Sequence, residues 1–153
     1  MECNMESIKG GVTAAKGFCA AGLNAGIKNN EKKDMAMVYS EKPCVTAGTF
    51  TTNKVFAAPV KWDKDIVANS PFAQAVVVNS GVANACTGKE GDDACAAEAK
   101  AVSEALQVPE SAVLVASTGV IGAQLPMDKI CAGIKELPKK LGSSLEHGTL
   151  AAE

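Results

Sequence analysis

The run AQAVVVN at residues 73–79 constrains the fold more than any other segment of this chain. A short apolar run of this kind is typical of a strand that is buried on both faces. A loop, GVANACTGKEG, follows it, and the pair Asp92-Asp93 then opens a predicted helix that ends near Leu106. Acidic residues suit the positive end of a helix, and the many alanines of this segment permit close packing against a sheet.

A second unit of the same kind follows. Residues 113–117 form another predicted strand, closed by Ser117-Thr118-Gly119, and a helix is expected over 126–137 from the proline that opens it. Upstream, the sequence predicts two strands at 34–40 and 44–51, joined as an antiparallel hairpin by the short connector EKP.

The remaining segments have weaker patterns. The glycine-rich residues 9–29 are expected to be extended chain with turns, and 63–70 to be a short helix or a loop. The expected fold class is therefore α/β or α+β, a layered sandwich of sheet and helices, in a single domain over 1–153 with no internal boundary.

Charge and composition exclude several classes of function. The net charge is −2 and all fifteen cations are lysines, so neither a basic surface for nucleic acid nor a guanidinium fork for phosphate is present. The start of the chain has no signal-peptide pattern, and no window reaches the length of a membrane span. We therefore expect a cytoplasmic protein that binds neither nucleic acid nor a membrane.

Six cysteines are scattered without a C-x-x-C pair: Cys3, Cys19, Cys44, Cys86, Cys95 and Cys131. Structural zinc sites need such close pairs, so no metal is expected, and we expect all six to be reduced thiols that pack as small apolar groups. The single histidine, His147, lies in a polar stretch and is expected to be a surface residue. Asp92 and Asp93 are expected to be a solvated pair in the first turn of their helix.

Two loops that follow the buried strands are the candidate site. The first runs from Asn79 to Gly88 and the second from Ser117 to Gly122. In open α/β sheets ligands bind at the carboxyl ends of strands, and these loops combine hydroxyl and amide side chains with glycines. They can serve as an oxyanion hole, a set of donors aimed at developing negative charge, or as two tight turns capped by Ser, Thr and Asn.

At these residues a family resemblance emerges. The blocks GVTAAKGF, KKDMAMVYSE, AGTFTTNKVFAAPV, VVVNSGVANACTG and ASTGVIGAQLPMDKI resemble, in this order, the ornithine acetyltransferases of arginine biosynthesis, also called glutamate N-acetyltransferases or bifunctional ArgJ proteins. The resemblance covers essentially the whole chain from Gly10. One residue departs from the pattern, because Val82 occupies a position where the family usually has asparagine.

The resemblance implies an N-terminal-nucleophile-like architecture and an acyltransferase. Its members cut themselves before a threonine into an α and a β chain, expected as a heterotetramer of two of each, and the new N-terminal threonine passes acetyl from N2-acetyl-L-ornithine to L-glutamate. Bifunctional members also use acetyl-CoA, as a donor substrate and not as a cofactor. The Thr-Gly pair of the oxyanion hole corresponds to Thr118 and Gly119.

By the same resemblance, the cleavage site and a substrate-binding Thr-Thr-Asp segment lie beyond Glu153. The chain would then be the N-terminal part of an α chain that lacks the nucleophile and is inactive alone. No substrate-binding residue is assigned within it. Two alternatives stay open: a related N-terminal-nucleophile aminopeptidase, and a non-catalytic binding module.

Overall fold

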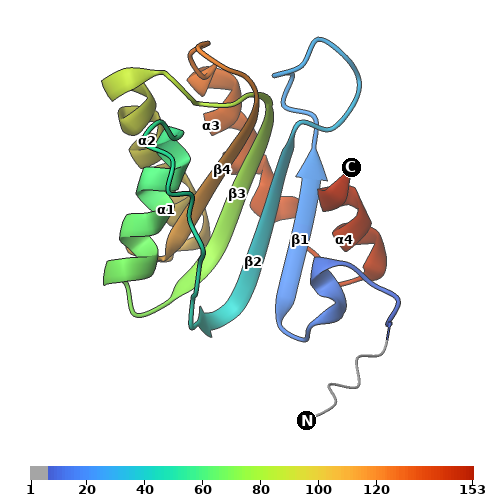
Figure 1. Cartoon of the computed structure of the whole chain (residues 1–153). Helices are drawn as coiled ribbons and strands as arrows, with labels where there is room; N and C mark the ends of the chain where they lie inside the picture. The colour runs from blue at the N-terminus through green and yellow to red at the C-terminus, as the bar shows by residue number, and fades with distance from the viewer. Residues whose placement is uncertain (1–6) are drawn as a thin grey trace.

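The computed structural model describes residues 7–153, which form one mixed four-stranded sheet with helices packed on it (Figure 1). The strands are β1 (Phe18–Leu23), β2 (Met35–Cys44), β3 (Ala73–Val82) and β4 (Val113–Val120). The α-helices are α1 (Ala58–Asn69), α2 (Gly88–Leu106), α3 (Met127–Glu136) and α4 (Leu145–Ala152). Short 3₁₀ helices lie at Val12–Ala14, Glu110–Ala112 and Leu137–Lys140. The α+β class expected from the sequence is confirmed.

The sheet has its strands in chain order, β1-β2-β3-β4. The first two pairings are antiparallel, whereas β3 and β4 run parallel and are joined by the crossover through α2. A parallel pair requires such a crossover, because the chain must return to the starting end of the sheet. The carboxyl ends of β3 and β4 therefore lie together at one end of the sheet.

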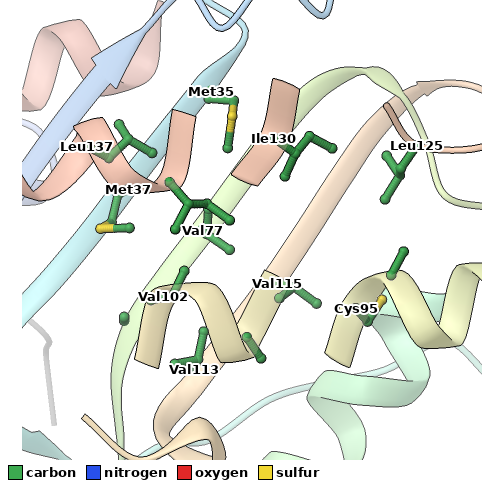
Figure 2. Packing of buried hydrophobic residues seen from close by; sticks show 14 of the residues in the cluster. Met35, Met37, Val77, Cys95, Val102, Val113, Val115, Leu125, Ile130 and Leu137 are labelled. Carbon is green, nitrogen blue, oxygen red and sulfur yellow. The ribbon is translucent and has the colours of Figure 1, made fainter. Parts of the chain in front are cut away.

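One face of the sheet carries the apolar core. Alternate residues of the strands point into it, and α2 and α3 cover it with the fully buried Val102 and Ile130 (Figure 2). Ile134 of α3 belongs to the same buried cluster. The sheet contributes Ala21, Met35, Met37, Ala75, Val77, Val113 and Val115. Burial of these side chains is the main stabilising term of the fold.

The opposite face is covered unevenly. Helix α4 packs on β1, where the Leu150 carbonyl lies so close to Gly22 that a side chain there would collide with it. Strands β3 and β4 present Val76, Val78 and Leu114 on this face, and all three are only partly buried. We call this surface, between α4 and the β4 edge, the open face.

The predicted hairpin at 34–51 is wrong in its second strand. β2 continues through the expected connector to Cys44, and residues 45–57 form neither a helix nor a strand. The true hairpin partner of β2 is β1, within the segment expected to be extended chain with turns. The bulge of β2 between Tyr39 and Cys44 absorbs the polar residues that resembled a turn.

Three other expectations are confirmed with longer bounds. The strand expected at 73–79 runs to Val82, and the one at 113–117 runs to Val120. The helix expected at 92–106 begins four residues earlier, at Gly88, whereas the one at 126–137 is close to the observed α3. Of the segment 63–70, all but Ser70 lies within α1, and Ser70 caps its carboxyl end. The helix begins at Ala58 and has Pro59 in its first turn, where a proline costs no hydrogen bond.

Candidate functional site

The two candidate loops meet at the carboxyl ends of β3 and β4. Their first residues are paired in the sheet, with Ser80 opposite Thr118 and Gly81 opposite Gly119. Beyond the strands two backbone hydrogen bonds continue the connection, from Ala83 N–H to the Val120 carbonyl at 3.0 Å and from Gly122 N–H to the Ala85 carbonyl at 2.9 Å. The structure therefore brings both predicted loops into one unit.

Glycine is required at the contact between the loops. Gly81 and Gly119 both have positive φ angles, 118° and 138°, which L side chains rarely adopt. A Cβ on Gly119 would also lie 2.2 Å from the Gly81 carbonyl carbon. The two backbones can approach this closely because Gly119 has no side chain.

Thr118 is exposed and faces away from the core. Val113 and Val115 are fully buried, so the alternation of side chains along β4 places Leu114, Ala116 and Thr118 on the open face. The hydroxyl of Thr118 is thus accessible to a group that approaches from that side.

The backbone of β4 also alternates between two directions. Val115 N–H is directed away from β3, because it donates to Asp63 Oδ1 of α1 at 3.0 Å. Every second residue of β4 directs its N–H the same way, so the amide of Gly119, four residues further along, also points away from β3. The Val120 carbonyl, by contrast, points toward β3 and accepts a hydrogen bond from Ala83 N–H. The Gly119 N–H therefore takes no part in the hydrogen bonds between β3 and β4.

Asn84 and Thr87, in the NACTG block, have a structural role. Asn84 is fully buried with a φ of 47°, and its side-chain amide donates to the Gly91 carbonyl at 3.0 Å. Its oxygen accepts a hydrogen bond from the Thr87 hydroxyl at 2.7 Å. For these residues the interpretation as a capped turn is the one that the contacts support.

The first residue of each loop carries a buried polar atom that has no partner within residues 7–153: Asn79 Oδ1 and Ser117 Oγ. These residues are opposite each other in the β3–β4 register. Unpaired buried groups are rare in native structures, because each loses its hydrogen bonds to water without gaining a replacement.

Other residues singled out in the sequence have ordinary roles. His147 is half-buried, with Nδ1 2.6 Å from the hydroxyl of Ser144, the residue that caps α4. Asp92 and Asp93 lie in the second turn of α2, not the first, and form ion pairs with Lys61 and Lys89 at the surface. Val82 is partly buried and packs against the core cluster.

The cysteines at positions 19, 44, 86, 95 and 131 carry free thiols, and Cys3 lies outside the described residues. Burial raises the pKa of Cys95 to about 12, so this thiol is unreactive at neutral pH. Over residues 7–153 no group of three His, Cys, Asp or Glu side chains is placed to hold a metal ion. No helix in that range is both long and apolar enough to span a bilayer.

Two carboxyl groups are strongly perturbed. Glu98 of α2 is fully buried and its carboxylate oxygens have no partner within residues 7–153, and burial raises its pKa to about 8. Burial likewise raises the pKa of Asp63 to about 6, against the opposing effect of its hydrogen bond from Val115. Neither belongs to the two loops, and sequence reasoning selected neither, since a glutamate inside an alanine-rich helix carries no distinctive pattern.

Comparison with known proteins identifies the family. The model of the ArgJ family matches residues 19–152, which is most of the chain. The chain belongs to the ArgJ family. It is 47% identical over 149 residues to the arginine biosynthesis bifunctional protein ArgJ of Gloeobacter violaceus, an alignment that covers 97% of this chain and 36% of the relative. The chain thus spans about a third of the length of the curated ArgJ relatives that it matches.

Two solved ArgJ-family structures share this fold. The ornithine acetyltransferase of Mycobacterium tuberculosis, solved in complex with ornithine, superimposes with a TM-score of 0.91 at 43% identity, over 94% of this chain and 77% of that one. The bifunctional ArgJ protein of Bacillus halodurans gives a TM-score of 0.88, also at 43% identity, over 94% and 73% of the two chains. The family and the fold expected from the sequence blocks are therefore confirmed.

Proposed function

We propose that this chain forms the oxyanion-hole part of a glutamate N-acetyltransferase, an enzyme that moves the acetyl group of N2-acetyl-L-ornithine to L-glutamate. The observation that supports this most strongly is the junction of the two loops, where the exposed Thr118 hydroxyl and the adjacent Gly119 amide lie at the carboxyl ends of paired strands. Ornithine bound to the M. tuberculosis relative agrees with this substrate class.

The proposed chemistry needs donors rather than a titrating group. A threonine hydroxyl oxygen attacks the acetyl carbonyl carbon, negative charge develops on the carbonyl oxygen, and the C–N bond then breaks as the ornithine amine takes up a proton. The amine of glutamate attacks the resulting acetyl ester and the threonine hydroxyl is restored. In both steps the Thr118 Oγ–H and the Gly119 N–H would donate to the same carbonyl oxygen.

The nucleophilic threonine would come from a β chain released by self-cleavage of a common precursor, in a heterotetramer of two α and two β chains. The open face supports such a partner, since its partly buried apolar side chains lie next to Thr118 and can pack against a second chain. The isolated 153-residue chain should then be inactive and prone to self-association.

The reaction as proposed requires no cofactor, because acetyl passes between a hydroxyl and two amines. Acetyl-CoA would enter only as an alternative acetyl donor. The five free thiols among residues 7–153 suit a reducing compartment, and we place the enzyme in the cytoplasm.

A chimera tests the proposal. Residues 1–153 replace the matching segment of the G. violaceus ArgJ protein, and transfer of acetyl from N2-acetyl-L-ornithine to glutamate is measured. Thr118→Ala should lower kcat roughly 100- to 1000-fold with little change in KM, because the lost donor acts mainly in the transition state. Thr118→Ser, which keeps a hydroxyl, is the matched control and should retain much of the activity.

Two results would overturn the proposal. One is a folded chimera that processes itself but transfers no acetyl group. The other is a folded Thr118→Ala chimera with the kcat of the unsubstituted chimera, which would remove Thr118 from the mechanism.

A further inference from the structure

A cavity of about 260 Å³ adjoins the candidate site on the open face. Ser80, the register partner of Thr118, forms part of its wall together with Val78 of the same strand. The residues 24–34, between β1 and β2, and the end of α4 close the other sides. A molecule whose reactive group lies at Thr118 can therefore extend along the sheet into this cavity.

The 24–34 segment is held rigidly against the end of β3. Asp34 is almost fully buried, and its two carboxylate oxygens accept hydrogen bonds from the backbone amides of Ala25 at 2.6 Å and Lys28 at 2.9 Å. The Asp34 carbonyl in turn accepts from Ser80 N–H at 2.8 Å. These bonds fix the position of the Lys28 backbone relative to the site.

The Lys28 side chain lies across the glycine of the first loop. Its Cγ would be 3.3 Å from a Cβ placed on Gly81, and its half-buried stem enters the wall of the cavity. Long cationic side chains commonly pack their stems in this way and present the ammonium group to solvent or to a ligand.

Of the charged side chains Lys28, Lys33 and Asp34 at the cavity, only Lys28 lacks a close partner of opposite charge or a set of short hydrogen bonds in the described part of the chain. Lys33 is paired with Glu153, and the Asp34 carboxylate is occupied by the two backbone amides. Within residues 7–153 the Lys28 ammonium forms no ion pair, and its one hydrogen bond is a long contact of 3.5 Å to the Lys33 carbonyl. A half-buried cation of this kind favours an anionic guest.

We propose that Lys28 binds the carboxylate of the amino-acid substrate in this cavity, while the acetyl group lies at Thr118. The choice of ligand rests on the proposed function, since both N2-acetyl-L-ornithine and glutamate carry a carboxylate close to the nitrogen that gains or loses acetyl. Lys28 is thus a binding residue that orients the acyl group, and takes no part in the bond changes.

The test compares two ligands that differ only in the carboxylate. The purified 153-residue chain is labelled with ¹⁵N at its lysines and held at a concentration where sedimentation shows a monomer. It is titrated by NMR with N2-acetyl-L-ornithine and with N-acetylputrescine, its decarboxylated analogue. The wild-type chain should bind the first at least about 10-fold more tightly, as expected of a charge-assisted hydrogen bond. The Lys28 Nζ resonance should shift only with the first ligand.

Three substitutions make the assignment specific. Lys28→Met keeps the stem over Gly81 and should abolish the preference for the carboxylate, whereas Lys28→Arg should keep most of it. Lys32→Met removes the same charge from an exposed residue of the same segment and should leave the preference intact. Equal binding of both ligands by the wild-type chain, absence of binding, or a preference that survives Lys28→Met would overturn the inference.

These outcomes are independent of catalysis. A chimera that transfers no acetyl group would contradict the proposed function and leave the binding measurement unchanged. An active chimera combined with carboxylate-independent binding would contradict only the role of Lys28.

Discussion

Gly119 and Gly81 lie in backbone contact across the paired ends of β4 and β3, with 2.4 Å between the Gly81 oxygen and the position that a Cβ on Gly119 would take. This contact joins the two loops that carry the candidate site. It also determines which residue type the position tolerates, because the obstacle is backbone, which cannot rotate away as a side chain can.

Gly119→Ala is therefore expected to destabilise the chain by roughly 2–4 kcal/mol, from the positive φ angle and the collision together. Urea unfolding measures the loss. Gly122→Ala is the matched control, since Gly122 has a φ of 83° in the same loop but open space around it, and should cost only about 1 kcal/mol. Equal losses in the two variants would contradict the crowding argument.

Glu98 makes stability depend on pH in an unusual direction. Its folded-state pKa of about 8 lies above the ordinary 4.5, so the folded chain holds a proton that the unfolded chain releases. Its contribution to the free energy of unfolding is fully present below pH 4.5 and is lost as pH rises toward 8. Between pH 6 and 8, above the pKa of Asp63 at about 6, Glu98 should dominate this decline.

Glu98→Gln should flatten the pH dependence of the unfolding free energy between pH 6 and 8. It should also stabilise the chain at pH 8 by a few kcal/mol, since no charge is then buried. Glu104→Gln, an exposed position on the same helix, serves as the control and should reproduce the wild-type curve. A Glu98→Gln curve with the wild-type slope would show that the carboxyl group titrates normally.

Helix α1 closes the outer edge of β4 with two side chains. Trp62 Nε1 donates to the Val113 carbonyl at 2.9 Å, and Asp63 accepts from Val115 N–H. Asp63→Ala leaves that amide without its partner and should cost about 1–3 kcal/mol in urea unfolding, and Trp62→Phe should cost about 1 kcal/mol for its hydrogen bond alone. Asp65→Ala, at an exposed position of the same helix, should change stability by less than about 0.5 kcal/mol.

Thiol labelling follows burial. Cys86 is exposed, whereas Cys95 is 1% exposed with a raised pKa, so iodoacetamide should modify Cys86 first and Cys95 only after unfolding. In the unfolded, unreduced chain we expect six labels by mass spectrometry, including one on Cys3. Fewer than six would contradict the prediction that all the thiols are free.

The sequence predicted β3 and β4, the strands that carry the candidate site, better than it predicted β1 and β2. The apolar run before Asn79 and the valines before Ser117 are short, rich in β-branched residues and bounded by turn residues, which favours buried strands, and both loops follow directly from them. The roles of Thr118 and Gly119 in catalysis stay predictions, and the Thr118→Ala chimera tests the first of them.

β1 escaped detection because FCAAGL lacks the β-branched residues that favour strands, and its pairing with β2 decides its conformation. The opposite error, a strand at 44–51, arose from threonines whose local preference the tertiary structure overrides. Lys28 could not be selected either, since only the folded chain places its side chain against Gly81.

The side chains that close the β4 edge have a consequence for assembly. Unpaired edges of sheets are where chains add strand to strand into fibrils, and Trp62 and Asp63 occupy two of the outward groups of β4, the Val113 carbonyl and the Val115 amide. At the opposite border, Ala20 of β1 exchanges two backbone hydrogen bonds with Gly142. Because both borders of the sheet are partly occupied in this way, a further strand finds few free groups to pair with, and the architecture itself disfavours open-ended growth of the sheet.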